Sequence, residues 1–155
     1  MKRIKTRIEP TWDALTLAVP VCFSDVDAMK IVWHGHYLRY CESAREAWCA
    51  ERGLSYQRME AIASVAPVVR VQLEYLRPAR HGDVLAVRVA RVPGSEPSLD
   101  LFYEVRGPDG ALLAIAETVQ VFIDPTGYPF LSPPPPVEAF FAESRRRERA
   151  NGATA

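Results

Sequence analysis

The stretch from Phe23 to Tyr37 holds the residues of this sequence that are best suited to chemistry. It contains two carboxylates, Asp25 and Asp27, and two histidines, His34 and His36, at the mouth of a segment with helical spacing. A carboxylate can accept a proton or attack a carbonyl carbon. The unpaired backbone amides at the start of a helix can bind developing negative charge. This combination predicts acyl chemistry.

The two carboxylates differ in their suitability for catalysis. Aspartate often caps a turn before a helix, and the spacing alone leaves capping and catalysis open for both residues. Asp27 is the stronger catalytic candidate, because it lies in a polar segment between a hydrophobic strand and a buried helix. Partial desolvation in such a place raises the basicity of a carboxylate.

The sequence offers little support for other reaction centres. His34 and His36 lie two residues apart, so they face different sides of a helix, and the chain has one other histidine, His81. This arrangement argues against a metal site. No Gly-x-Ser-x-Gly elbow, glycine-rich phosphate loop or dinucleotide fingerprint is present.

A helix with an apolar face must position the candidate residues. Seven apolar residues recur at spacings of three and four, the period of one helical face: Trp33, Tyr37, Tyr40, Cys41, Ala44, Ala47 and Trp48. Gly53 readily takes the left-handed conformation that ends a helix, so we expect roughly 17 helical residues. Further apolar residues widen the stripe, and we expect protein on most sides of this helix.

Strand patterns flank the helix. The run from Leu15 to Phe23 contains Pro20, which predicts an edge strand or a bulge. Alternating apolar residues predict four more strands, at Val69 to Tyr75, Leu85 to Val89, Leu99 to Val105 and Leu112 to Asp124. Tight turns such as Gly107 to Gly110 predict antiparallel pairing, and the helix before a run of strands predicts an α+β domain.

Length and charge fit one globular domain. The 155 residues are 48% hydrophobic and 25% charged, which is ordinary for a chain that buries a core. Lys plus Arg equals Asp plus Glu at 19 each, so no global field favours nucleic acid or an anionic membrane. No apolar run is long enough to cross a bilayer and no hydrophobic signal core follows the first residues. We therefore expect a cytoplasmic protein without stable membrane insertion.

The chain divides into three parts. Residues 1–14 form a polar lead-in, residues 15–131 the folded domain, and residues 132–155 a proline-rich and charged tail. We expect this tail to be solvated or frayed, without a nucleic-acid role. Three cysteines without Cys-x-x-Cys spacing argue against disulfides or zinc, and we interpret them as small buried hydrophobic residues: Cys22, Cys41 and Cys49.

The motif Asp-x-Asp-Ala-x-x-Ile-Val-Trp-His-x-x-Tyr-x-x-Tyr-x-Glu-x-Ala-Arg, from Asp25 to Arg45, resembles the 4-hydroxybenzoyl-CoA thioesterase family of hotdog-fold acyl-CoA thioesterases, which includes a Tol-Pal-associated bacterial branch. The resemblance continues from Glu74 to Arg80, at Asp83, and from Ala116 to Asp124. It implies a hotdog fold, in which a curled antiparallel β-sheet wraps a long central helix. It also implies subunits joined through their sheets, with active sites at the interface, as a homodimer or homotetramer.

The resemblance also implies roles for two residues of the motif. Asp27 matches the catalytic carboxylate, which acts as the nucleophile or as the general base for water. The backbone N–H of His34 matches the oxyanion donor near the helix start. The implied substrate is an acyl-CoA or an acyl-carrier-protein thioester, and no cofactor is implied.

Five residues are candidates for substrate binding. Lys30 replaces the glycine usual in the family, so either the turn differs or Lys30 faces the substrate entrance. Trp33 and Tyr37 line either a pocket or the core. Arg77 and Arg80 belong to a basic cluster that is either simply solvated or suited to the phosphates of coenzyme A.

The main hypothesis is a thioester hydrolase that releases a carboxylic acid and a free thiol. Two alternatives remain open. One is a non-catalytic hotdog protein that binds acyl thioesters, given Lys30 and His36 in the motif. The other is a hotdog dehydratase of 3-hydroxyacyl thioesters, in which a histidine paired with an acid moves the proton.

Overall fold

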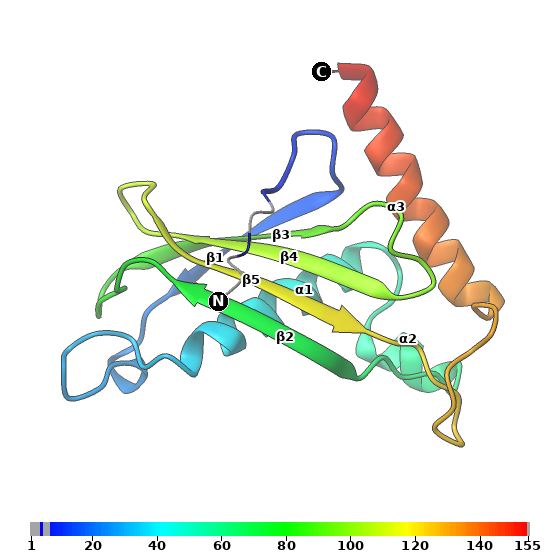
Figure 1. Ribbon diagram of the computed structural model, residues 1–155, viewed down its shortest axis with the longest axis horizontal. Coiled ribbons are helices and arrows are strands. Elements are labelled where there is room, and N and C mark those ends of the chain that lie inside the picture. The colour runs from blue at the N-terminus through cyan, green and yellow to red at the C-terminus, as the bar shows by residue number, and fades with distance from the viewer. Residues whose placement is uncertain (1–3, 5–6, 155) are drawn as a thin grey trace.

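A five-stranded antiparallel sheet forms the body of the protein in the computed structural model, which describes residues 4 and 7–154 (Figure 1). Its strands are β1 (Ala14–Pro20), β2 (Val68–Tyr75), β3 (Val84–Arg91), β4 (Leu99–Arg106) and β5 (Leu112–Gln120). They lie in the order β1-β3-β4-β5-β2, and each neighbouring pair is antiparallel. The predicted α+β architecture with antiparallel pairing is confirmed.

The edges of the sheet agree with the sequence patterns, whereas two strand ends do not. Pro20 ends β1 at an edge, where a missing N–H is best tolerated. The predicted strand to Phe23 is therefore shorter, and a 3-10 turn follows it at Phe23–Asp25. β5 ends at Gln120 instead of Asp124, because the chain beyond it makes isolated bridges to Val65 and Pro129 through Ile123.

The predicted helix is α1 (His36–Glu51), which lies against one face of the sheet (Figure 1). Its buried apolar residues keep the predicted spacing: Tyr37, Tyr40, Cys41, Ala44, Trp48 and Cys49. The opposite face of α1 is open in the single chain, where Leu38 is 40% exposed. The chain thus covers one side of the helix, and Gly53 follows its end with a φ of 79°.

The C-terminal segment differs from the solvated end that the sequence predicted. After the short α2 (Tyr56–Ala61), the last helix is α3 (Pro135–Thr154). Phe140 of α3 lies 5.5 Å from the Trp48 ring, and Phe141 lies 5.8 Å from Phe122 between ring centroids. Both α3 phenylalanines are buried in the core. Prolines are well tolerated in the first turn of a helix, so the proline run marks where α3 starts.

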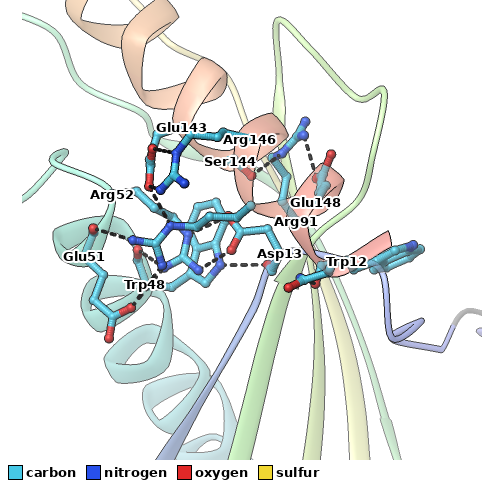
Figure 2. Close-up of polar contacts among 12 residues, drawn as sticks. Trp12, Asp13, Trp48, Glu51, Arg52, Arg91, Glu143, Ser144, Arg146 and Glu148 are labelled. Carbon is cyan, nitrogen blue, oxygen red and sulfur yellow. Dashed lines mark hydrogen bonds and ion pairs between the residues drawn. The ribbon is translucent and has the colours of Figure 1, made fainter. Parts of the chain in front are cut away.

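Two buried arginines tie the helices to the sheet (Figure 2). Arg52, which follows α1, is 1% exposed and donates through Nε to the Asp13 carboxylate at 2.6 Å. Arg91 of β3 donates to the Ser144 hydroxyl at 2.8 Å and to the Glu148 carboxylate at 2.6 Å, both on α3. Because a buried charge is tolerated when it is paired, these contacts fix α3 at the end of α1 opposite His36.

The lead-in assigned to residues 1–14 lies partly outside the described residues. Of its described part, Ile8 and Asp13 are buried. Within the described chain, no helix combines the length and the apolar character needed to cross a bilayer.

Candidate active site

A tight turn before α1 carries the candidate catalytic residues. Val26 and Val32 form an isolated antiparallel bridge. Inside it, the Asp27 N–H donates to the Ile31 carbonyl at 2.9 Å and the Lys30 N–H donates to the Asp27 carbonyl at 2.9 Å. Lys30 has a φ of 60°. The turn therefore holds a lysine in the left-handed conformation, at a cost of about 1–2 kcal/mol.

Asp25 anchors this turn to α1. Its carboxylate is buried and accepts hydrogen bonds from the Tyr40 hydroxyl at 2.8 Å, the Cys22 N–H at 3.1 Å and the Arg39 guanidinium. Burial raises the pKa of Asp25, but the three donors outweigh it and leave that pKa below the ordinary aspartate value. A charged carboxylate with this many donors has a structural role: it holds the turn against α1.

Asp27 faces a pocket instead. Its side chain is half-buried, and Oδ1 accepts the Met29 N–H at 2.8 Å. Among the described residues, the other oxygen, Oδ2, has no hydrogen-bond partner, so it is available to a substrate or to water. The pocket has a volume of about 300 Å³ and is lined by Asp27, Met29, Ile31, Val32, His34, Tyr37, Tyr75, Leu76, Arg77 and Pro78. We call it the acyl pocket.

The amide of His34 lies two residues before the first residue of α1. Of the nearby amides, those of Trp33 and His36 are engaged, because the Trp33 N–H donates to the Asp25 carbonyl and the His36 N–H donates to the Trp33 carbonyl, both at 2.9 Å. Within the described part of the chain, the His34 N–H itself has no acceptor. A free amide at a helix start is the kind of group that binds an oxyanion.

Gly35 lets an aromatic ring close the turn. A Cβ at this position would lie 2.1 Å from the Trp33 ring, which is far inside contact distance. The indole therefore rests on the bare glycine backbone, and Trp33 remains 47% exposed. This packing places Trp33 beside the acyl pocket and outside its lining.

Tyr75 is a pocket residue that the sequence reasoning missed. Its hydroxyl donates to the His34 carbonyl at 2.9 Å, although the two residues are 41 positions apart. The ring also meets Tyr37 edge-to-face, with 5.3 Å between centroids. In the sequence, two signals mark Tyr75: it ends an alternating strand pattern, and it lies in the Glu74 to Arg80 segment that resembles the thioesterase family.

The predicted substrate-binding residues fall into three places. Tyr37 and Arg77 line the acyl pocket together with Asp27 and His34. Arg80 lines an adjacent pocket of about 450 Å³, the second pocket, which shares Arg77 and Pro78 with the first. Lys30 and Trp33 lie outside both linings. The structure thus brings four of the seven site residues around one cavity.

The cysteines and possible metal ligands lie apart from this chemistry. Burial raises the pKa of Cys41 to about 12 and that of Cys49 to about 11, so both remain neutral thiols in the core. Cys22 is exposed, contrary to the prediction, because it sits in the loop after the edge strand β1. In the part of the chain that the structure describes, no group of three His, Cys, Asp or Glu side chains could hold a metal ion.

Comparisons with known proteins identify the family of the chain. A family model described as the thioesterase-like superfamily matches residues 21–143. A 1,4-dihydroxy-2-naphthoyl-CoA hydrolase from a Synechocystis species is 30% identical over 105 residues, which cover 66% of this chain and 76% of that protein. The acyl-CoA thioester hydrolase YbgC of Escherichia coli is 29% identical over 107 residues, covering 69% and 80% of the two chains.

One of the similar solved structures contains a bound ligand. A thioesterase from Thermus thermophilus, complexed with coenzyme A and Zn, has a TM-score of 0.73 and 28% sequence identity. The match covers 90% of this chain and 96% of that one. Coenzyme A binding is therefore seen in a structural relative.

The sheet and its long helix define the hotdog class of thioesterases, as the motif predicted. The chain belongs to the thioesterase-like superfamily. It is an enzyme of the thioester hydrolase class.

Proposed function

We propose that the protein hydrolyses an acyl-CoA or acyl-carrier-protein thioester, with Asp27 as the reacting carboxylate and the His34 N–H as the oxyanion donor. The observation that carries this proposal is that both residues line one pocket. The free Oδ2 of Asp27 and the unengaged N–H of His34 supply the two functions that thioester cleavage needs.

Two routes are compatible with this pair. In one, Asp27 Oδ2 attacks the thioester carbonyl carbon, the thiolate leaves, and water then cleaves the resulting anhydride. In the other, Asp27 takes a proton from a water that attacks the same carbon. In both routes the C–S bond breaks, the thiol gains a proton and a carboxylic acid is released. The His34 N–H donates to the carbonyl oxygen while it carries negative charge.

The two adjacent pockets fit a substrate with an apolar end and an anionic end. The acyl pocket is lined largely by apolar and aromatic side chains, which suit an acyl group. Arg77 lines both the acyl pocket and the second pocket, and Arg80 lines the second pocket. Among the described residues, neither guanidinium makes an ion pair, so both can bind the phosphates of coenzyme A.

We propose a homodimer or homotetramer that forms through β2. This strand is an edge of the sheet, and Val69 and Val71 on it are 59% and 44% exposed. An exposed apolar edge is a template for pairing with another chain. The open face of α1, with Leu38, adds a second apolar surface. Measurement of the solution mass tests this proposal, and a monomer would contradict it.

A thioester panel that follows thiol release tests the activity. Asp27→Asn retains the size of the side chain and the acceptor for the Met29 N–H, so the turn should persist. We expect a loss of about 10²–10⁴-fold in kcat. Glu9→Gln is the matched control and should retain full turnover, because Glu9 is exposed and lies outside the lining of both pockets. Wild-type turnover no higher than that of Asp27→Asn would refute hydrolysis through Asp27 and favour the non-catalytic binding protein.

The same panel tests the second pocket when it includes acyl-pantetheine, which lacks the nucleotide. If Arg77 and Arg80 bind phosphates, acyl-pantetheine should show a higher KM than acyl-CoA, and equal KM values would exclude that role. The dehydratase alternative is less well supported by the site. Within the described chain, the His34 ring contacts the rings of Trp33 and Tyr75 and no carboxylate.

A further inference from the structure

The hydroxyl of Tyr75 connects the edge strand β2 to the turn that carries the oxyanion donor. It donates to the His34 carbonyl at 2.9 Å. The position of Tyr75 is fixed by its pairing with Ala114 in the sheet and by the edge-to-face contact with Tyr37. Burial raises the pKa of Tyr75, so the hydroxyl keeps its proton at neutral pH and acts as a donor.

This hydrogen bond completes the restraint on His34. The Trp33–His34 peptide is held because the Trp33 carbonyl accepts the His36 N–H at 2.9 Å. The next peptide, His34–Gly35, is held through its carbonyl by Tyr75. A peptide is planar, so fixing a carbonyl also fixes the N–H on its other side. His34 therefore lies between two peptides of set orientation.

The direction of the His34 carbonyl matters for charge. If this peptide rotated, the negative end of its carbonyl could turn toward the position where the oxyanion develops. The Tyr75 hydroxyl restrains this carbonyl through its hydrogen bond and partly neutralises its negative charge. Donors that are oriented before the reaction stabilise the transition state at little reorganisation cost.

We propose that Tyr75 is a positioning residue for thioester hydrolysis, which acts by holding the His34 carbonyl and with it the backbone of His34, whose own N–H binds the oxyanion. The inference rests on the proposed function of the acyl pocket. Tyr75 acts through the backbone of His34 and does not need to touch the reacting atoms.

Tyr75→Phe tests this role because it removes the hydroxyl and keeps the ring that lines the pocket. We expect kcat to fall about ten-fold, less than the roughly 10²–10³-fold typical for deleting an oxyanion donor itself. KM should stay within about two-fold, since the pocket wall is unchanged. Tyr128→Phe is the matched control, because Tyr128 is 72% exposed in the loop after β5, and its kinetics should equal those of the wild type.

A second readout reports the backbone independently of turnover. In amide ¹H–¹⁵N spectra, the Gly35 resonance should move in Tyr75→Phe and stay in place in Tyr128→Phe. A moved Gly35 amide together with a lower kcat and a retained KM supports the positioning role.

Three results would overturn it. In the first, the wild type is active and Tyr75→Phe has the same kcat. This result refutes the inference and leaves the proposed function standing. The second is a raised KM with unchanged kcat, which makes Tyr75 a binding residue. The third is a wild type inactive on every thioester, which refutes the proposed function and this inference together.

Discussion

Replacing Lys30 by glycine should stabilise the protein. Lys30 holds a φ of 60°, which costs an L-residue about 1–2 kcal/mol. Glycine removes this cost but adds about 0.5–1 kcal/mol of conformational freedom to the unfolded chain. The difference predicts a net gain of about 0.5–1 kcal/mol. For a chain of this size, Tm should rise by roughly 1–4 °C, measured by calorimetry or thermal circular dichroism.

Two control variants separate the backbone from the side chain. Lys30→Ala removes the ammonium group and keeps the left-handed strain, so its Tm should equal that of the wild type. Ala63→Gly relieves a φ of 50° elsewhere in the chain and should give a comparable gain without an effect on turnover. If Lys30 faces the substrate entrance and its ammonium group binds substrate, Lys30→Gly and Lys30→Ala should raise KM equally, because both variants lack that group.

Two results would contradict a strained backbone at Lys30. A lower Tm for Lys30→Gly would show that the lysine side chain contributes more than its backbone costs. An equal rise in Tm for Lys30→Ala would show that the side chain, not the left-handed conformation, is the source of instability.

Two further substitutions test the anchor and the last helix. Asp25→Asn should cost about 1–3 kcal/mol at pH 7, because the Arg39 and Tyr40 donors lose their charged acceptor. The pKa of Asp25 is lowered in the folded state, so the stabilisation by its carboxylate is full above the ordinary value of 3.8 and is lost as the pH falls through the folded pKa. In urea denaturation, the stabilities of the wild type and of Asp25→Asn should therefore converge below pH 3.8. Phe141→Ala should lower the free energy of unfolding by about 3 kcal/mol, because Phe141 is fully buried. An unchanged urea midpoint would show that α3 does not share the core.

The sequence was sufficient for the architecture because the patterns involved are local. Alternation at β3 and the three-and-four spacing along α1 each report which side of an element faces the core. The same reasoning failed at residues 132–155, where prolines and charges outweighed two adjacent phenylalanines. Whether Phe140 and Phe141 are buried depends on a surface that the β-sheet and α1 create together, and no local pattern describes that surface.

The roles of the residues in the functional motif follow partly from the sequence and partly from the tertiary structure. The sequence by itself indicated the family, the turn before α1 and Asp27 as the better carboxylate. The tertiary structure decided that Asp25 is the buried carboxylate that holds the turn against α1 and that Tyr75 lies against His34. Asp25 and Asp27 are the same residue type two positions apart, so their difference lies in their neighbours, which come from α1 and from the sheet. A hydrogen bond between residues 41 positions apart forms because the fold brings their atoms together, and the spacing of residues along the chain does not encode it.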